Sequence, residues 1–144
     1  MGTGTRGFGF GRRRSGHGRL NSGKIFAVIG ALWAMTAVVF GAFGAHALRN
    51  RLDPTMLETV ETGVRYQMYH ALGLFAVAWA TTQYTSTALR ASGWLMFTGS
   101  VIFSGSLYVL AISGTRWWGA VTPIGGIAMI LGWALLAWGV MRSR

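Results

Sequence analysis

The sequence predicts an all-α fold: an integral membrane bundle of four transmembrane helices, with a short amphipathic extracytoplasmic helix between the first and the second. Charged residues make up 11% of the 144 residues and hydrophobic residues make up 52%. A water-soluble domain carries about 25% charged residues, so this chain cannot cover a surface that faces water. Four stretches without any Asp, Glu, Lys or Arg run for 23 to 25 residues each. Each stretch is long enough to cross a bilayer core of about 30 Å, which needs about 20 apolar residues in a helix.

Residues 1–24 form a predicted disordered, basic, Gly/Arg-rich cytoplasmic tail, and residues 25–144 form the transmembrane domain. The tail holds 8 Gly and 6 of the 13 basic residues, and it contains almost nothing that a fold would bury. We expect anionic lipid as its partner, which attracts basic residues by about 1 kcal/mol each near the surface. Phe8 and Phe10 among the glycines suggest nucleic acid as an alternative. We favour lipid, because a role in setting the orientation of the chain explains the same charge.

The four spans are expected where the uncharged stretches lie, at about residues 25–47, 64–82, 93–112 and 117–141. The first is longer than the apolar region of a signal peptide, which spans about 7–15 residues, so we expect a helix that stays in the membrane. The second is the least apolar, because the segment from Thr81 to Thr87 is polar, and we end this span near Thr82. Strands are not expected, because the strands of a membrane barrel alternate apolar and polar residues.

The loop between the first and second spans has its own helical signals. It holds all three acidic residues of the chain, Asp53, Glu58 and Glu61. Asp53 followed by Pro54 is typical of a helix N-cap and first helical position. Apolar residues then recur at helical spacing, and we expect a short amphipathic helix that runs into the second span, with a break at Gly63. Glu61 and Arg65 have the spacing of a surface ion pair.

Basic residues near the span ends predict the orientation, because cytoplasmic loops of membrane proteins are enriched in Lys and Arg. One side of the membrane would carry the six basic residues of the tail together with Arg90, Arg142 and Arg144. The other side would carry only four, Arg49, Arg51, Arg65 and Arg116. Both termini are therefore expected on the cytoplasmic side.

A candidate polar cluster consists of His46, Tyr66, His70 and Tyr108. Ionisable residues inside a membrane are functional candidates, and a pair of His residues can relay protons or bind a metal ion. The structural alternative is that Tyr66, Tyr69 and Gln67 hydrogen-bond an imidazole. No third metal ligand has a suitable spacing, so we expect neither a metal site nor a cofactor. No carboxylate lies inside a span, which argues against a carboxylate-driven ion pump.

Small and helix-bending residues recur along the spans and suggest close helix packing. In lipid, small residues let helix backbones approach, and this packing replaces the hydrophobic drive of water. Proline inside a helix bends it and frees a carbonyl group. The candidate packing motifs contain Gly41, Gly44, Ser104, Thr122, Pro123 and Gly126.

The sequence contains no phosphate loop, zinc-protease helix, nucleophile elbow or dinucleotide fingerprint, so no catalytic residues are proposed and an enzyme is not expected. The first hypothesis is a non-enzymatic integral membrane protein that self-associates as a homo-oligomer or serves as an accessory subunit of a larger membrane complex. The alternative hypothesis is a small conduit for protons, a metal ion or a small solute that uses His46 and His70.

Four ordered motifs also resemble a known family. They are GAFGAH (residues 41–46), YQMYHAL (66–72), FSGSLY (103–108) and TPIGG (122–126), followed by Gly132-Trp133. Over about residues 25–141 the chain is similar to the domain of unknown function 423 family, whose bacterial members lie in the inner membrane. The resemblance implies a four-helix inner-membrane protein with no established activity, cofactor or catalytic residues. The Gly/Arg tail departs from the family pattern.

Overall fold

The computed structural model describes residues 17–143, and every regular element in this part of the chain is a helix. The predicted all-α fold is confirmed. The elements are α1 (His17–Phe43), a π-helical turn η1 (Gly44–Leu48) that continues α1, α2 (Pro54–Gln83), α3 (Thr87–Ser113) and α4 (Trp117–Arg142).

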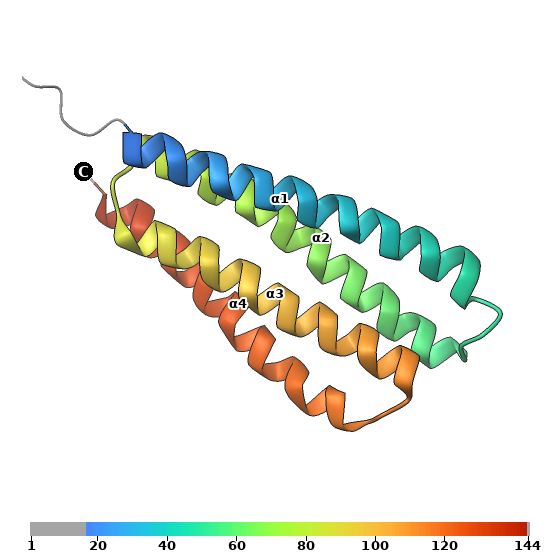
Figure 1. Ribbon diagram of the computed structural model, residues 1–144. Coiled ribbons are helices and arrows are strands. Elements are labelled where there is room, and N and C mark those ends of the chain that lie inside the picture. The colour runs from blue at the N-terminus through green and yellow to red at the C-terminus, as the bar shows by residue number, and fades with distance from the viewer. Residues whose placement is uncertain (1–16, 144) are drawn as a thin grey trace, which may run out of the picture.

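The four long helices lie side by side and alternate in direction (Figure 1). The start of α1, the connection from α2 to α3 and the end of α4 lie at one end of the bundle. The two other connections lie at the opposite end. The principal contacts join α1 to α2, α2 to α3 and α3 to α4, so α1 and α4 form the two edges of the bundle.

Within residues 17–143, three helical segments are long and apolar enough to cross a membrane, and they are Ser22–Leu48, Thr87–Ser113 and Trp117–Arg142. They correspond to the first, third and fourth predicted spans. α2 is not among them, because its first turns carry charged residues and it contains Gln67 and His70 in its middle.

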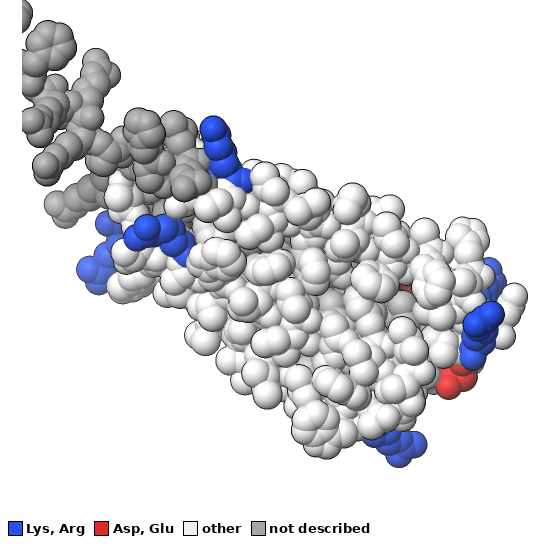
Figure 2. Space-filling view, viewed as in Figure 1, with Lys and Arg blue, Asp and Glu red and all other residues white. Residues whose placement is uncertain are grey.

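The sides of the bundle are covered by large apolar side chains, while Lys, Arg, Asp and Glu gather at its two ends (Figure 2). Ile130 and Met141 on α4 are 69% and 74% exposed, and Val38 on α1 is 61% exposed. Apolar surface on this scale is unusual for a soluble monomer. It fits a helical bundle whose sides face hydrocarbon and whose ends face water.

The start of α2 follows the prediction, but the expected break at Gly63 is absent. Asp53 caps the helix, because its Oδ1 accepts a hydrogen bond of 2.9 Å from the backbone N–H of Met56. Pro54–Gln83 is then one continuous helix, and no separate amphipathic helix precedes the span. Gly63 instead makes room for a ring, since an added Cβ would lie 2.7 Å from Cε1 of Tyr108.

The boundary between tail and membrane domain also differs from the prediction. α1 begins at His17, so the helix starts before the expected first residue of the span, residue 25. The predicted tail from residue 1 to residue 16 lies outside the described residues.

Two apolar clusters fill the space between the helices. One contains Phe26 of α1, Leu74 and Val77 of α2 and Met96 of α3. The other, nearer the opposite end, contains Val60 and Tyr108. Polar side chains occupy the level between these clusters, and they form the candidate site.

Candidate functional site

Gln67 lies at the centre of the polar level and joins three helices. Its side chain is fully buried. Nε2 donates to the carbonyl oxygen of Trp33 at 3.1 Å and to Oγ1 of Thr36 at 2.7 Å, both on α1. Oε1 accepts from the hydroxyl of Tyr108 on α3 at 2.8 Å. An amide has one acceptor and two donor hydrogens, so these bonds use its hydrogen-bonding groups.

Serine hydroxyls make further bonds between helices above and below Gln67. The indole N–H of Trp33 donates to Oγ of Ser100 at 2.8 Å, which ties α1 to α3. Oγ of Ser104 donates to the carbonyl oxygen of Gly63 at 2.8 Å, which ties α3 to α2. Oγ of Ser92 donates to the carbonyl oxygen of Gly132 on α4, also at 2.8 Å. In lipid such bonds fix the register of helices that have no other directional contact.

His70 connects α2 to α4 and uses both of its ring nitrogens. Nδ1 lies 2.7 Å from the carbonyl oxygen of Tyr66, and Nε2 lies 3.2 Å from the indole nitrogen of Trp133. A carbonyl can only accept and an indole N–H can only donate, so Nδ1 carries the proton and Nε2 the lone pair. The imidazole is therefore neutral, and neither nitrogen is free to bind a metal ion.

The structure brings together two of the four members of the predicted polar cluster and places His46 apart from them. Tyr66 and His70 are neighbours, with ring centroids 6.4 Å apart. Tyr108 bonds to Gln67 rather than to the imidazole. His46 is exposed in η1. Gly44, two residues before His46, packs against Val60 of α2. Val60 precedes His70 by ten residues, which is about 15 Å along a helix, so His46 and His70 lie about that far apart along the bundle.

Among residues 17–143 no group of three or more His, Cys, Asp or Glu side chains is placed to hold a metal ion. Every buried side-chain nitrogen or oxygen in this range also has a hydrogen-bond partner. The polar level is therefore a set of mutually satisfied groups, an arrangement that holds helices together.

The predicted packing residues divide into those that touch another helix closely and those that do not. Gly41 and Gly44 face Val64 and Val60 of α2, with an added Cβ at 3.3 and 3.2 Å from the nearest side-chain atom. Thr122 reaches α3 through a bond of 2.8 Å between its Oγ1 and Oγ of Ser106.

Pro123 and Gly126 lie on α4, and neither is buried. Pro123 lies inside α4 and is exposed. An added Cβ at Gly126 would be 3.9 Å from its nearest neighbour. The close approach falls on the adjacent Gly125, where an added Cβ would lie 2.6 Å from the carbonyl oxygen of Gly99.

Sequence reasoning missed the main residues of this site. It considered Gln67 only as a partner for an imidazole and Ser100 only as a small packing residue, and it assigned no role to Trp33 or Trp133. The available signal was a single amide in the middle of an apolar run, since such a group must find partners on other helices.

Comparison with known proteins places the chain in a family. The sequence model of the family described as "Protein of unknown function (DUF423)" matches residues 40–126. The chain belongs to the DUF423 family. The match begins near the end of α1 and ends in the first half of α4. It includes Gln67, His70, Ser104 and Tyr108, but not Trp33 or Trp133.

Several relatives of this DUF423 protein are named as membrane proteins. UPF0382 membrane protein YwdK of Bacillus subtilis is 46% identical over 114 residues, which cover 78% of this chain and 93% of the relative. UPF0382 membrane protein SSP2132 of Staphylococcus saprophyticus is 49% identical over 119 residues, 83% of this chain and 98% of the relative.

A more distant relative, UPF0382 inner membrane protein YgdD of Escherichia coli, is 36% identical over 121 residues, 84% of this chain and 92% of the relative. These three names state a membrane location and no activity. No solved structure matches the chain. This DUF423 protein is therefore a helical member of a membrane-protein family of unknown function.

Proposed function

We propose that this DUF423 protein is a non-enzymatic integral protein of the inner membrane, with all four helices crossing the bilayer and both termini in the cytoplasm. The name of the Escherichia coli relative supports the location. The alternation of the four helices supports an even number of crossings (Figure 1). The predicted excess of basic residues at the end that holds both termini supports the orientation.

The proposal that α2 also crosses the bilayer rests on how its two faces divide. Gln67, His70 and Thr81 are buried and face the other helices. The outer face carries Tyr69, Leu72, Phe75 and Trp79, which are 40–60% exposed. A helix can have a polar face toward the bundle interior and an apolar face toward the lipid. The mean hydropathy of such a helix is lower than that of the face that contacts lipid, so a low mean value is compatible with a membrane span.

Single cysteines test this topology directly, because the chain has no cysteine of its own. Asn50→Cys and Thr115→Cys are expected to react with a membrane-impermeant maleimide from the periplasmic side of intact cells. Thr87→Cys and Ser143→Cys are expected to react only after the membrane is permeabilised. If α2 did not cross, Asn50→Cys and Thr87→Cys would label from the same side, which would contradict the four-span arrangement.

We further propose that the protein acts by association, either with copies of itself or as an accessory subunit of a membrane assembly. The carrying observation is that every buried side-chain nitrogen and oxygen in the described part of the chain has a hydrogen-bond partner. No buried side-chain nitrogen or oxygen of the described residues is therefore left without a hydrogen bond and open to a ligand. The outer face of α1 is apolar and packs against no other described helix, with Leu32 and Met35 54% and 56% exposed.

Native mass spectrometry from lipid nanodiscs tests association. A mass of more than one copy, or of one copy with a second protein, is expected. Leu32→Cys on α1 and Ile130→Cys on α4 then identify the edge involved by oxidative cross-linking, each serving as the control for the other. A strict monomer with no co-purifying protein would contradict association while leaving the topology untouched.

The alternative of a conduit for protons, a metal ion or a small solute has less support. It needs His46 and His70 to act in one pathway, yet His46 lies exposed near one end of the bundle. His70 has both nitrogens engaged by Tyr66 and Trp133. No observation on the described residues favours this function over association.

A further inference from the structure

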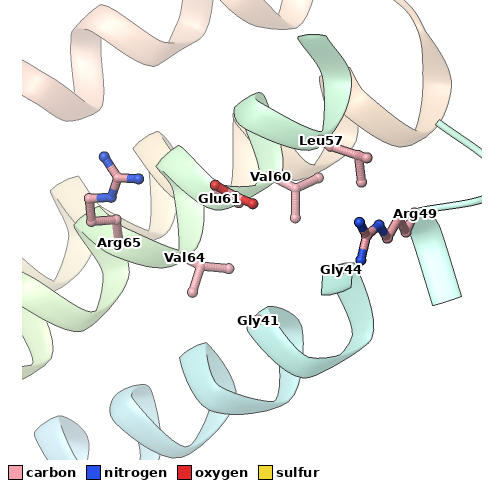
Figure 3. A pocket seen from close by; sticks show the side chains of 8 residues that line it. All are labelled: Gly41, Gly44, Arg49, Leu57, Val60, Glu61, Val64 and Arg65. Carbon is pink, nitrogen blue, oxygen red and sulfur yellow. The ribbon is translucent and has the colours of Figure 1, made fainter. Parts of the chain in front are cut away.

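A pocket of about 580 Å³ opens between α1 and α2 at the end of the bundle that holds their connection. Figure 3 shows its lining, with Val60 and Val64 of α2 above Gly41 and Gly44 of α1 and η1. Three charged side chains also line it, Arg49, Glu61 and Arg65. The pocket is therefore apolar on its walls and charged along its rim.

The apolar part of the pocket lining comes from small residues of α1 and η1 and branched residues of α2. Gly41 and Gly44 carry no side chains, so Val64 and Val60 can approach them closely, and an added Cβ would lie 3.3 and 3.2 Å from these valines. Leu57 adds a further apolar wall. A larger side chain at either glycine would press against the valine that faces it.

The charged groups of the pocket are unpaired. In residues 17–143 neither Arg49 nor Arg65 forms an ion pair, although the Glu61–Arg65 spacing predicts one. Figure 3 shows Glu61 between the two arginines in this view. Two cations and one carboxylate leave the pocket with a formal charge of +1.

We propose that this pocket binds the headgroup of an anionic phospholipid. The guanidinium groups of Arg49 and Arg65 hold the phosphodiester, because arginine donates paired, charge-assisted hydrogen bonds to phosphate oxygens. Glu61 accepts a hydrogen bond from a hydroxyl of the headgroup. The glycerol and the first carbons of the acyl chains lie against Val60 and Val64.

The position of the pocket favours lipid over a soluble anion. It lies where the charged end of the bundle meets the apolar sides that fit hydrocarbon (Figure 2). A soluble anion would gain nothing from the valine and leucine walls, whereas a lipid places its headgroup and its chains at these two levels. A cation site is disfavoured, because two of the three charged groups are arginines.

The inference rests on the proposed membrane embedding of the bundle, and its test does not depend on the number of spans. Full-length protein in detergent is titrated with phosphatidylglycerol or with phosphatidylcholine, and bound lipid is counted by native mass spectrometry. Wild-type protein is expected to bind phosphatidylglycerol about tenfold more tightly than phosphatidylcholine, a difference of about 1.4 kcal/mol. Equal affinity for the two lipids would overturn the proposal without any variant.

Two variants locate the site. Arg49→Gln/Arg65→Gln is expected to lose the preference for phosphatidylglycerol. Arg51→Gln is the matched control and is expected to keep it, because Arg51 is exposed in the same loop and does not line the pocket. Circular dichroism and elution volume check that each variant folds.

Three results would reject the site: a preference retained by the double variant, a loss in the Arg51→Gln control, or displacement of phosphatidylglycerol by an equal concentration of inorganic phosphate. The cysteine labels at Asn50 and Thr87 report the topology separately. Failure of the lipid site and failure of the four-span proposal are therefore distinguishable.

Discussion

Gly125→Ala is expected to destabilise the bundle by about 3 kcal/mol, because α3 and α4 touch through their backbones at this position. An added Cβ would lie 2.5 Å from the backbone nitrogen of Phe103 and 2.6 Å from the carbonyl oxygen of Gly99. Backbone atoms cannot rotate away as side chains do, so the two helices must separate. Overpacking of this kind costs about 1–3 kcal/mol, and sometimes more. The free energy of unfolding is measured by titrating the purified protein from mild detergent into sodium dodecyl sulfate.

The matched control is the neighbouring glycine. An added Cβ at Gly126 would meet only the ring of Phe103, at 3.9 Å, which is an ordinary contact. Alanine is a better helix former than glycine by about 0.5–1 kcal/mol, so Gly126→Ala is expected to be neutral or slightly stabilising. Similar losses for both variants would show that α3 and α4 do not meet at Gly125.

Gln67→Leu is expected to destabilise the protein by about 3 kcal/mol. The substitution keeps a side chain of similar size but removes three hydrogen bonds, two to α1 and one to Tyr108. Such bonds average about 0.6 kcal/mol in membrane proteins. Leaving the buried hydroxyl of Tyr108 without a partner adds about 1–3 kcal/mol. The same unfolding titration measures the loss.

Gln83→Leu is the control for this experiment, because Gln83 lies on the same helix but is exposed at its end. It bonds only to the adjacent Thr82, and a change within about 0.5 kcal/mol is expected. Tyr108→Phe is expected to cost about 1 kcal/mol less in the Gln67→Leu background than in the wild type, because the two residues share a bond. Additive losses would mean that Gln67 and Tyr108 do not interact.

Local patterns in the sequence were sufficient for the class of protein and for most helix limits. The uncharged runs predicted membrane helices because crossing hydrocarbon requires length and apolarity, and both can be counted along a chain. The capping signal at Asp53 and Pro54 likewise depends only on neighbouring residues, and α2 begins where it indicates.

The sequence was misleading where a residue's role depends on a partner from another helix. Glycine is a residue type that often interrupts helices, yet Gly63 lies inside α2, and its missing side chain leaves room for the ring of Tyr108. The sequence does not show which of the adjacent residues Gly125 and Gly126 contacts another helix. Only the rotation of α4 against α3 decides that Gly125 faces Gly99.

The predicted polar cluster is wrong about His46 for the same reason. Proximity to one end of a span suggested that His46 and His70 would meet, but the register of α1 against α2 separates them. That register is set by bonds such as those from Gln67 to Trp33 and Thr36, across more than thirty residues of chain. The amino-acid sequence alone therefore determined that this protein is helical and lies in a membrane, because both properties follow from composition and local order, and its ordered motifs carried the resemblance to its family. The tertiary structure alone decided which polar groups satisfy one another and where a charged pocket opens, because both depend on how the helices are rotated and aligned.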